Sequence, residues 1–159
     1  MTSRLVLVDT QIWHFARVEP VEEEFREVHG AAKLFLAGLL EDASLRIAMS
    51  AYQGAEVLEA LRRSKVPEED RLALLDDMET AKFLVVDLTG EVVRRASLDS
   101  SESGIHVYDY LAVYPMGGLV DRIYSADRHL LHRHFTSIAP VENPLKPWSL
   151  VEGQIPSKA

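Results

Sequence analysis

The sequence predicts an α/β domain with a mostly parallel sheet and helices on both of its faces. Short apolar runs rich in β-branched residues recur along the chain, and stretches in which apolar residues have helical spacing lie between them. Continuous apolar runs are typical of strands that are buried on both faces, as the strands of a parallel sheet are. A length of 159 residues fits one domain of ordinary size.

Four strands are predicted from these apolar runs. The first, Leu5–Val8, ends at Asp9 and Thr10, which can cap the helix that follows. Three further runs and a short edge strand complete the sheet, at residues 46–49, 83–87, 122–125 and 137–139. Because these strands alternate with helices, we expect them to run parallel.

Helices are predicted where apolar residues recur at helical spacing. The longest runs from Val21 to Leu40, with acids near its start, where the helix dipole favours them. The others cover residues 11–16, 51–65, 67–78, a segment that follows Thr89, 107–114 and 127–134. Small polar residues predict a loop at 99–104. Prolines beyond residue 140 predict an irregular tail, which lies across the body because Trp148 needs somewhere to pack.

The composition excludes several classes of protein. Without cysteine, the chain has no disulfide framework, zinc knuckle, thiolate nucleophile or iron–sulfur cluster. It has no Gly-rich loop of the kind that P-loop enzymes need. Its apolar runs are far shorter than the roughly 20 residues of a membrane span, and its first residues lack the pattern of a signal peptide. We therefore expect a cytoplasmic protein that does not bind membranes.

The charge balance argues against a protein held on nucleic acid by a global positive field. The chain has 17 Lys and Arg against 25 Asp and Glu, which gives a formal net charge of -8. This balance does not exclude a nuclease, because a site that collects metal ions must be locally acidic and the bound metal reverses the local field.

Four acidic residues occur where the carboxyl edge of the predicted sheet should lie. Asp9 and Asp127 close the first and fourth strands. Glu56 lies near the start of the helix after the second strand, and Asp109 lies in the first turn of the helix that begins at Val107. Ligands bind at this edge in open parallel sheets. All four have apolar neighbours in the sequence, where a carboxylate is costly unless it is paired, hydrogen-bonded or bound to metal.

A simpler interpretation treats each acid as a helix cap or a first-turn acid. Taken alone, each residue favours that interpretation, because Asp is common at helix N-termini. The combination favours a shared site. Glu56 carries most weight, because Ala55 and Val57 beside it belong to an apolar helix face.

Four segments in this order resemble the PIN domain, and in particular the VapC-type toxin ribonucleases of toxin–antitoxin pairs. The segments are LVDT at 7–10, AEVL at 55–58, VYDYLA at 107–112 and SADRHL at 125–130. The resemblance implies a three-layer α/β/α fold with a central mostly parallel sheet. It also implies a PIN-like nuclease domain at residues 1–141, followed by a Pro-containing tail at 142–159 that is packed on the domain or partly disordered.

The resemblance also implies a function. Such proteins are endoribonucleases that depend on Mg²⁺ or Mn²⁺, leave a 5′-phosphate and a 3′-hydroxyl, often form homodimers and are often inhibited by a small antitoxin protein. The residues that match the family's acidic positions are Asp9, Glu56, Asp109 and Asp127. Thr10 and Ser125 match its hydroxyl positions, with Ser125 in place of a more usual Thr. Gln11 and Leu130 depart from the family pattern, at positions where Asn and an aromatic residue are frequent.

Each matching residue has an expected role. Asp9, Asp109 and Asp127 would hold metal directly or through water, because hard divalent cations prefer carboxylate ligands. Glu56 would hold a second ion or orient the attacking water. Thr10 or Ser125 would donate to a carboxylate or a substrate phosphate. Arg128 begins a basic segment that is either a phosphate-contact strip or a solvated helix face.

Three alternatives stay open at this point. A phosphoryl-transfer enzyme of another α/β family is disfavoured, because the acid that a haloacid-dehalogenase phosphatase needs two residues after its nucleophile is replaced by Gln11. A PIN-like domain without catalytic activity, kept as a binding or assembly module, would not need a complete set of acids. A PIN nuclease that works in RNA processing without an antitoxin would have the same site as a toxin.

Overall fold

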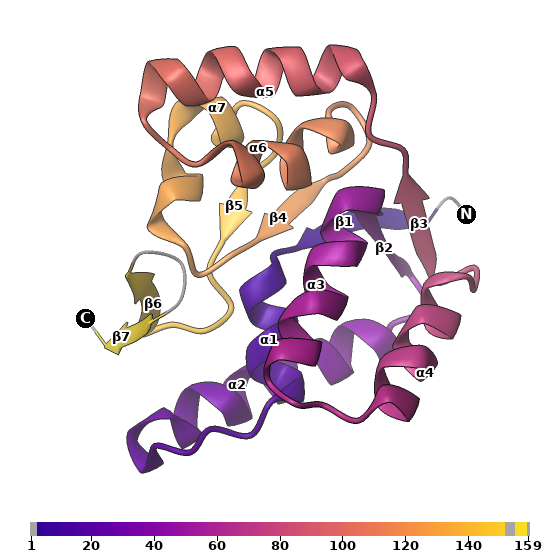
Figure 1. Ribbon diagram of the computed structural model, residues 1–159, viewed down its shortest axis with the longest axis vertical. Helices are drawn as coiled ribbons and strands as arrows, with labels where there is room; N and C mark the ends of the chain where they lie inside the picture. Colours follow the sequence, from indigo (N-terminus) through magenta and orange to yellow (C-terminus); the bar gives the residue numbers. More distant parts are fainter. Residues whose placement is uncertain (1–2, 152–154, 159) are drawn as a thin grey trace.

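The computed structural model describes residues 3–151 and 155–158. Its centre is a sheet of five strands in the order β3-β2-β1-β4-β5, and every neighbouring pair is parallel (Figure 1). The strands are β1 (Arg4–Val8), β2 (Leu45–Ser50), β3 (Phe83–Val86), β4 (Arg122–Tyr124) and β5 (Val141–Glu142).

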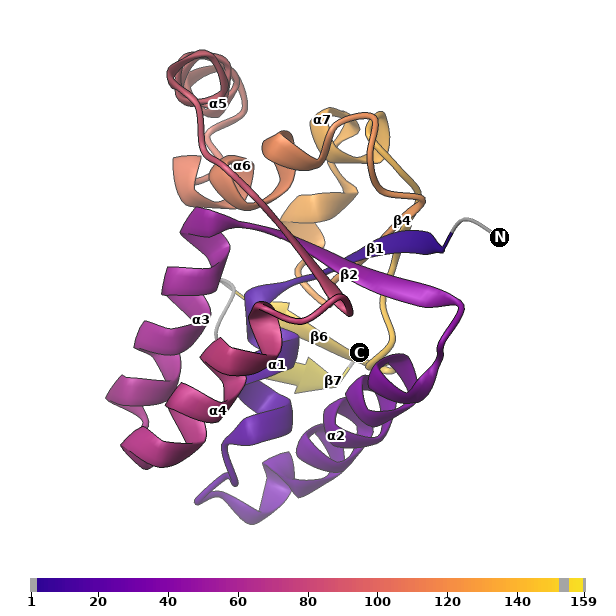
Figure 2. The same ribbon diagram turned by 90° about the vertical axis from the view of Figure 1, so that its right-hand side faces the viewer.

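Helices cover both faces of this sheet. One layer contains α1 (Thr10–Arg17), α2 (Arg26–Glu41), α3 (Ala51–Arg63) and α4 (Glu68–Met78). The other contains α5 (Gly90–Ser103), α6 (Val107–Val113) and α7 (Arg133–Thr136), and Figures 1 and 2 show the two layers on opposite sides of the strands. This arrangement confirms the predicted three-layer α/β/α fold. No helix in the described part of the chain is long and apolar enough to cross a membrane.

The alternation of side chains along β1 explains the two layers. Val6 and Val8 pack into the core beneath α1 and α2, whereas Leu7 packs into the core beneath α6. All three are almost fully buried. A strand with apolar residues on both faces can be covered only by a layer on each side, as the sequence predicted.

Two predicted helix boundaries are wrong. The helix expected from Val21 begins only at Arg26, after a 3-10 turn at Glu23–Phe25, because Val21 is 95% exposed and has no core to contact. The loop expected at 99–104 is helix as far as Ser103, and only Gly104 ends it. The small polar residues are tolerated there because the last turns of α5 are largely exposed and Ser100 Oγ donates to Ile105 O at 2.5 Å.

Two predictions near the fourth strand are also wrong. The edge strand is not at 137–139 but at Val141–Glu142, because Pro140 O accepts from Ile123 N and Glu142 O accepts from Ser125 N, both at 2.9 Å. The helix expected at 127–134 is divided into a 3-10 turn, Arg128–Leu131, and the short α7. His132 separates them with an extended backbone, and its side chain caps α7.

The chain beyond residue 142 is more regular than its prolines predicted. Strands β6 (Trp148–Val151) and β7 (Ile155–Lys158) pair in an antiparallel hairpin, and an edge strand of a two-stranded sheet tolerates Pro156. Leu145, Trp148 and Leu150 are buried in the core beneath α1 and α2. The backbone of β6 also meets the segment after β4, where Leu150 N donates to Ala126 O at 2.9 Å. The boundary between a domain at 1–141 and a tail at 142–159 stays a prediction.

Substitution of Gly104 should test how α5 leads into α6. Gly104 has a φ of 78°, in the left-handed region, so Gly104→Ala should lower the free energy of unfolding by about 1 kcal/mol. Gly30 is the matched control, because it lies within α2 and an added Cβ would meet nothing within 4 Å. Gly30→Ala should raise the same quantity by about 0.5–1 kcal/mol. Urea unfolding measures both, and an equal change in the two variants would contradict the prediction.

Candidate metal centre

Asp9 lies directly after β1 and caps α1. Its Oδ1 accepts from Thr10 N at 2.8 Å, and its Oδ2 accepts from Ser125 Oγ at 2.6 Å. The side chain is buried, because β1 is a central strand and its end is covered by the segment that follows β4. A carboxylate is therefore buried at the carboxyl edge of the sheet, because Asp is favoured at helix N-termini and β1 is buried.

Asp127 follows β4, the strand next to β1. Its Oδ1 accepts from His129 N at 2.9 Å, and its backbone N donates to Ser125 Oγ at 3.0 Å. Ser125 therefore contacts both strand-end acids, since the same hydroxyl donates to Asp9. A single side chain fixes the relative positions of two carboxylates from neighbouring strands.

Glu56 reaches the same edge from α3. Its Oε1 accepts from Thr10 Oγ1 at 2.5 Å and its Oε2 accepts from Tyr52 Oη at 3.0 Å. Helix α3 is held at the end of β1, because Gln53 Nε2 donates to Val8 O at 2.6 Å. Both carboxylate oxygens of Glu56 thus have a donor, and their orientation is fixed.

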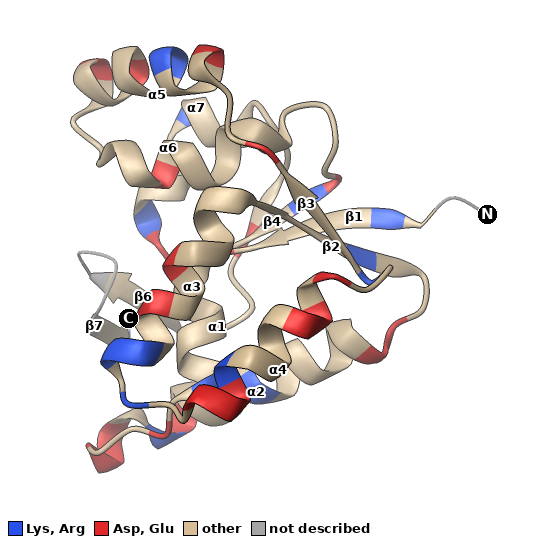
Figure 3. Ribbon diagram, turned by 45° about the vertical axis from the view of Figure 1, so that its right-hand side comes forward, with Lys and Arg blue, Asp and Glu red and all other residues tan. Residues whose placement is uncertain are grey.

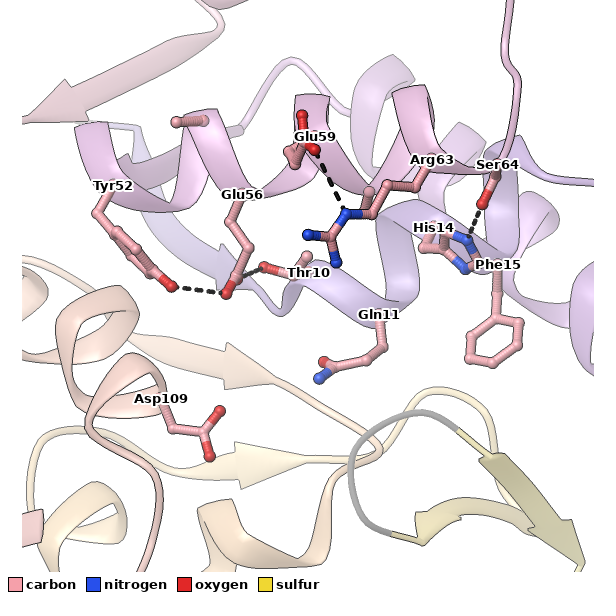
Figure 4. Close-up of a pocket in the computed structure, with 12 residues that line it drawn as sticks. Thr10, Gln11, His14, Phe15, Tyr52, Glu56, Glu59, Arg63, Ser64 and Asp109 are labelled. Atoms are coloured by element: carbon pink, nitrogen blue, oxygen red, sulfur yellow. Dashed lines mark hydrogen bonds and ion pairs between the residues drawn. The ribbon is translucent and has the colours of Figure 1, made fainter.

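Asp109 enters from the opposite helical layer, in the first turn of α6. One carboxylate oxygen of Asp109, one of Asp127 and a ring nitrogen of His129 lie within 4.8 Å of one another. Figure 3 shows acidic positions on α3 and α6 on the same side of the molecule, and Figure 4 shows Asp109 facing the side of the cleft that carries Glu56. The four predicted acids therefore come together from four separate segments of the chain.

Burial and mutual repulsion change the acidity of this cluster. Burial raises the pKa of Asp9 to about 8, with further contributions from Asp109 and Asp127 and an opposing one from the Ser125 hydroxyl. Burial also raises the pKa of Asp109 to about 7, together with repulsion by Asp127 and Glu56. The protein without metal therefore keeps protons in the cluster near neutral pH.

The donor set fits a hard divalent cation. Carboxylate oxygens are the ligands that Mg²⁺ and Mn²⁺ prefer, and a cation would offset the burial and the repulsion that raise these pKa values. The ligand atoms close enough to share an ion belong to Asp109, Asp127 and His129, whose half-exposed ring lies 3.5 Å from Asp127 Oδ1. Asp9 lies outside this group, although Ser125 links it to Asp127, so Asp9 and Glu56 could act beside the ion or hold it through water.

Two of the four acids, Glu56 and Asp109, line a cleft of about 650 Å³ between α1, α3 and α6 (Figure 4), whereas Asp127 lines a smaller pocket with Arg128 and Asp9 is buried. Thr10, Glu56 and Asp109 line one end of it, and Arg63 and Ser64 line the other. The centre is thus accessible to a ligand much larger than a metal ion.

The remaining predicted residue lies beside the centre. Arg128 is exposed, and its guanidinium donates to Ser149 Oγ at 3.0 and 3.2 Å, so that it ties β6 to the segment after Asp127. The sequence prediction did not include Tyr52, and it placed His129 only in the basic segment that begins at Arg128. The spacing of Tyr52 four residues before Glu56 on one helix face was a usable signal. The contact between Ser149 and Arg128 could not be predicted in this way, because the two residues are far apart in the sequence and meet only in the fold.

No protein-family model matches the chain, and no curated protein matches it in sequence. Solved structures do match. A chain of the VapBC2 complex from Rickettsia felis, solved with a DNA fragment from its promoter, is 16% identical, with a TM-score of 0.54 over 87% of this chain and 98% of that one. VapC20 from Mycobacterium tuberculosis, a toxin that cleaves the sarcin–ricin loop, is 16% identical, with a TM-score of 0.55 over 74% of this chain and 86% of that one.

These findings define the fold. The parallel sheet and the helical layers on both of its faces are those of a three-layer PIN-like domain. Within that class, the chain has the VapC-type PIN fold, which confirms the fold that its sequence resembled.

Proposed function

We propose that the protein is an endoribonuclease that depends on Mg²⁺ or Mn²⁺. The observation that carries this proposal is the meeting of Asp9, Glu56, Asp109 and Asp127 at one sheet edge, with the pKa of Asp9 raised to about 8 and that of Asp109 to about 7. A protein that only binds a partner gains nothing from carboxylates that are buried and repel one another, because they destabilise the fold unless a cation occupies the site.

Each residue has a proposed role in phosphodiester hydrolysis. Asp9, Asp109 and Asp127 would hold the ion. Bound there, the ion would supply an activated water and positive charge beside the phosphoryl oxygens. Glu56, held by Thr10 and Tyr52, would orient the attacking water and accept its proton. Ser125 holds Asp9 and Asp127 in fixed positions relative to each other. Arg128 would contribute positive charge near the substrate.

The biological role that we propose is that of a toxin. It would act in the cytoplasm as a homodimer and would be held inactive by a small antitoxin protein. Support comes from the likeness to VapBC2, which was solved as a complex, and to VapC20, a toxin that cleaves the sarcin–ricin loop. This role rests on analogy of fold, whereas the nuclease chemistry rests on the geometry of the acids.

RNA cleavage by the purified protein tests the nuclease proposal. We expect cleavage of single-stranded RNA with Mn²⁺ or Mg²⁺, products with a 5′-phosphate, and no cleavage after chelation with EDTA that returns when Mn²⁺ is restored. Equal cleavage with and without the ion would contradict the proposal. Expression in a bacterial host then separates a toxin from an RNA-processing nuclease, because only a toxin should arrest growth and be relieved by a small protein encoded next to it.

A further inference from the structure

The cleft extends well beyond the acids that the proposed chemistry uses. Its far end is formed by the last turn of α3 and the middle of α1, and both ends belong to one continuous space of about 650 Å³ (Figure 4). A scissile phosphate occupies only the acidic end. The remaining volume is large enough for further parts of a substrate.

Gln11 places an unpartnered polar atom beside this space. Its side chain lines the cleft between the acidic end and the far end (Figure 4). Its Oε1 is buried and has no hydrogen-bond partner among the described residues. A buried polar atom without a partner costs about 1–3 kcal/mol, so the position favours a ligand that supplies the missing partner.

The far end offers an aromatic surface and neutral polar groups. Phe15 is partly buried, and its ring stands at the wall of the cleft. Beside it, His14 Nε2 lies 2.8 Å from Ser64 Oγ. Burial lowers the pKa of His14, so this imidazole is uncharged at neutral pH and takes part as a hydrogen-bonding group. Nucleobases stack on such aromatic side chains.

Arg63 is the positively charged residue at the far end of the cleft, and it can leave its ion pair with Glu59. Its Nε lies 3.3 Å from Glu59 Oε1, and its side chain is 78% exposed. Arg62 binds the same carboxylate with two shorter contacts, 2.6 and 2.8 Å. Glu59 therefore keeps a partner when Arg63 turns towards a phosphate. Arg62 does not line the cleft.

We propose that Gln11, Phe15 and Arg63 form a subsite for the nucleotide next to the scissile phosphate of an RNA substrate. Phe15 stacks on the base, Gln11 hydrogen-bonds to the base edge or the ribose, and Arg63 binds the next phosphate in the strand. Along the cleft in Figure 4 the acids are followed by Gln11 and the Arg63 guanidinium and then by the Phe15 ring, so a phosphate bound by Arg63 lies nearer the acids than a base stacked on Phe15. The inference rests on the proposed ribonuclease function for the direction of the strand.

Binding measurements test the subsite without cleavage. In an Asp109→Asn background, a fluorescently labelled single-stranded RNA of mixed sequence is titrated by anisotropy. Phe15→Leu should weaken binding by about tenfold, because loss of one base-stacking contact has an effect of that order. Gln11→Leu and Arg63→Gln should each weaken it by about fivefold. Phe15→Tyr should retain binding, and thermal unfolding identifies any variant that has lost its fold.

Arg62→Gln is the matched control for Arg63→Gln. Both remove one positive charge from adjacent positions of α3, so general attraction of RNA would weaken binding equally in the two variants. Equal weakening would overturn the subsite, and so would full binding by both Phe15→Leu and Gln11→Leu. A larger effect of Arg63→Gln than of Arg62→Gln supports it.

Steady-state cleavage separates the subsite from the nuclease proposal. With intact acids, the three subsite variants should raise KM and leave kcat within about twofold, because they bind the ground state and the transition state alike. Cleavage with unchanged KM in all three variants would refute the subsite but not the nuclease proposal. Variant-specific loss of binding in a protein that cleaves no RNA would support the subsite and refute the nuclease.

Discussion

Asp109→Asn should reduce metal-dependent RNA cleavage by more than about a hundredfold. Replacement of residues that only support metal ligands already lowers metal affinity or activity by about ten- to a hundredfold. The amide is nearly the same size as the carboxylate but is a much weaker ligand for a hard cation. Asp109 is also the acid whose removal disturbs the fold least, since the structure gives its carboxylate no hydrogen-bond donor among the described residues, whereas Asp9 and Asp127 each accept backbone bonds.

Asp76→Asn is the matched control for this loss of cleavage. Asp76 is an exposed acid on α4, so Asp76→Asn makes the same change of net charge away from the cleft and should cleave RNA like the wild type. Initial rates with Mn²⁺ and urea unfolding are measured on the same preparations. Full cleavage by Asp109→Asn, or an equal loss in Asp76→Asn, would refute the role of the acidic centre.

The metal-free protein should become less stable as pH rises from about 5 to about 8, by about 6 kcal/mol. The pKa of Asp9 is raised to about 8 and that of Asp109 to about 7, so across this range the folded protein holds protons that the unfolded chain has released. The folded state therefore binds more protons, and its stability is greatest below the unfolded pKa of these acids and is lost as pH passes through their folded values.

Metal should oppose this dependence. At about pH 8 Asp109 is ionised and Asp9 is about half ionised, and binding of the cation should raise stability by about 2.7 kcal/mol at a hundredfold excess over its dissociation constant. Thermal unfolding of the EDTA-treated protein, with and without Mn²⁺, measures both effects. Asp109→Asn should be less sensitive to pH and should lose most of the gain in Tm. A wild-type stability that is flat with pH and unchanged by Mn²⁺ would contradict the repulsion on which the site depends.

The parts of the fold that the sequence predicted are those set by local patterns. The run Leu5–Val8 is apolar at every position, which permits only a strand with a layer on each side, and Asp9 after it has the side chain of a helix cap. The convergence of Glu56 and Asp109 with Asp9 followed from topology, since the carboxyl ends of parallel strands share one edge of a sheet.

The parts that the sequence did not predict depend on contacts between distant segments. The hairpin of β6 and β7 contains Pro156, and its first strand is held by Leu150 and Trp148 in a core whose α1 and α2 residues lie more than a hundred positions earlier. The helical end of α5 contacts the segment that follows it, because Ser103 Oγ lies 2.6 Å from Tyr110 Oη and Tyr114 Oη donates to Asp99. Local propensity is a weak guide where tertiary packing decides.

The joining of β6 to the segment after β4 couples the last strands of the chain to the acidic centre. Leu150 N is bonded to the carbonyl that precedes Asp127, Leu150 and Asp127 form a β-bridge, and Ser149 accepts from the arginine that follows Asp127. A nick or deletion within β6 would thus free both neighbours of Asp127. Under the proposed function, proteolytic trimming through β6 would inactivate the enzyme.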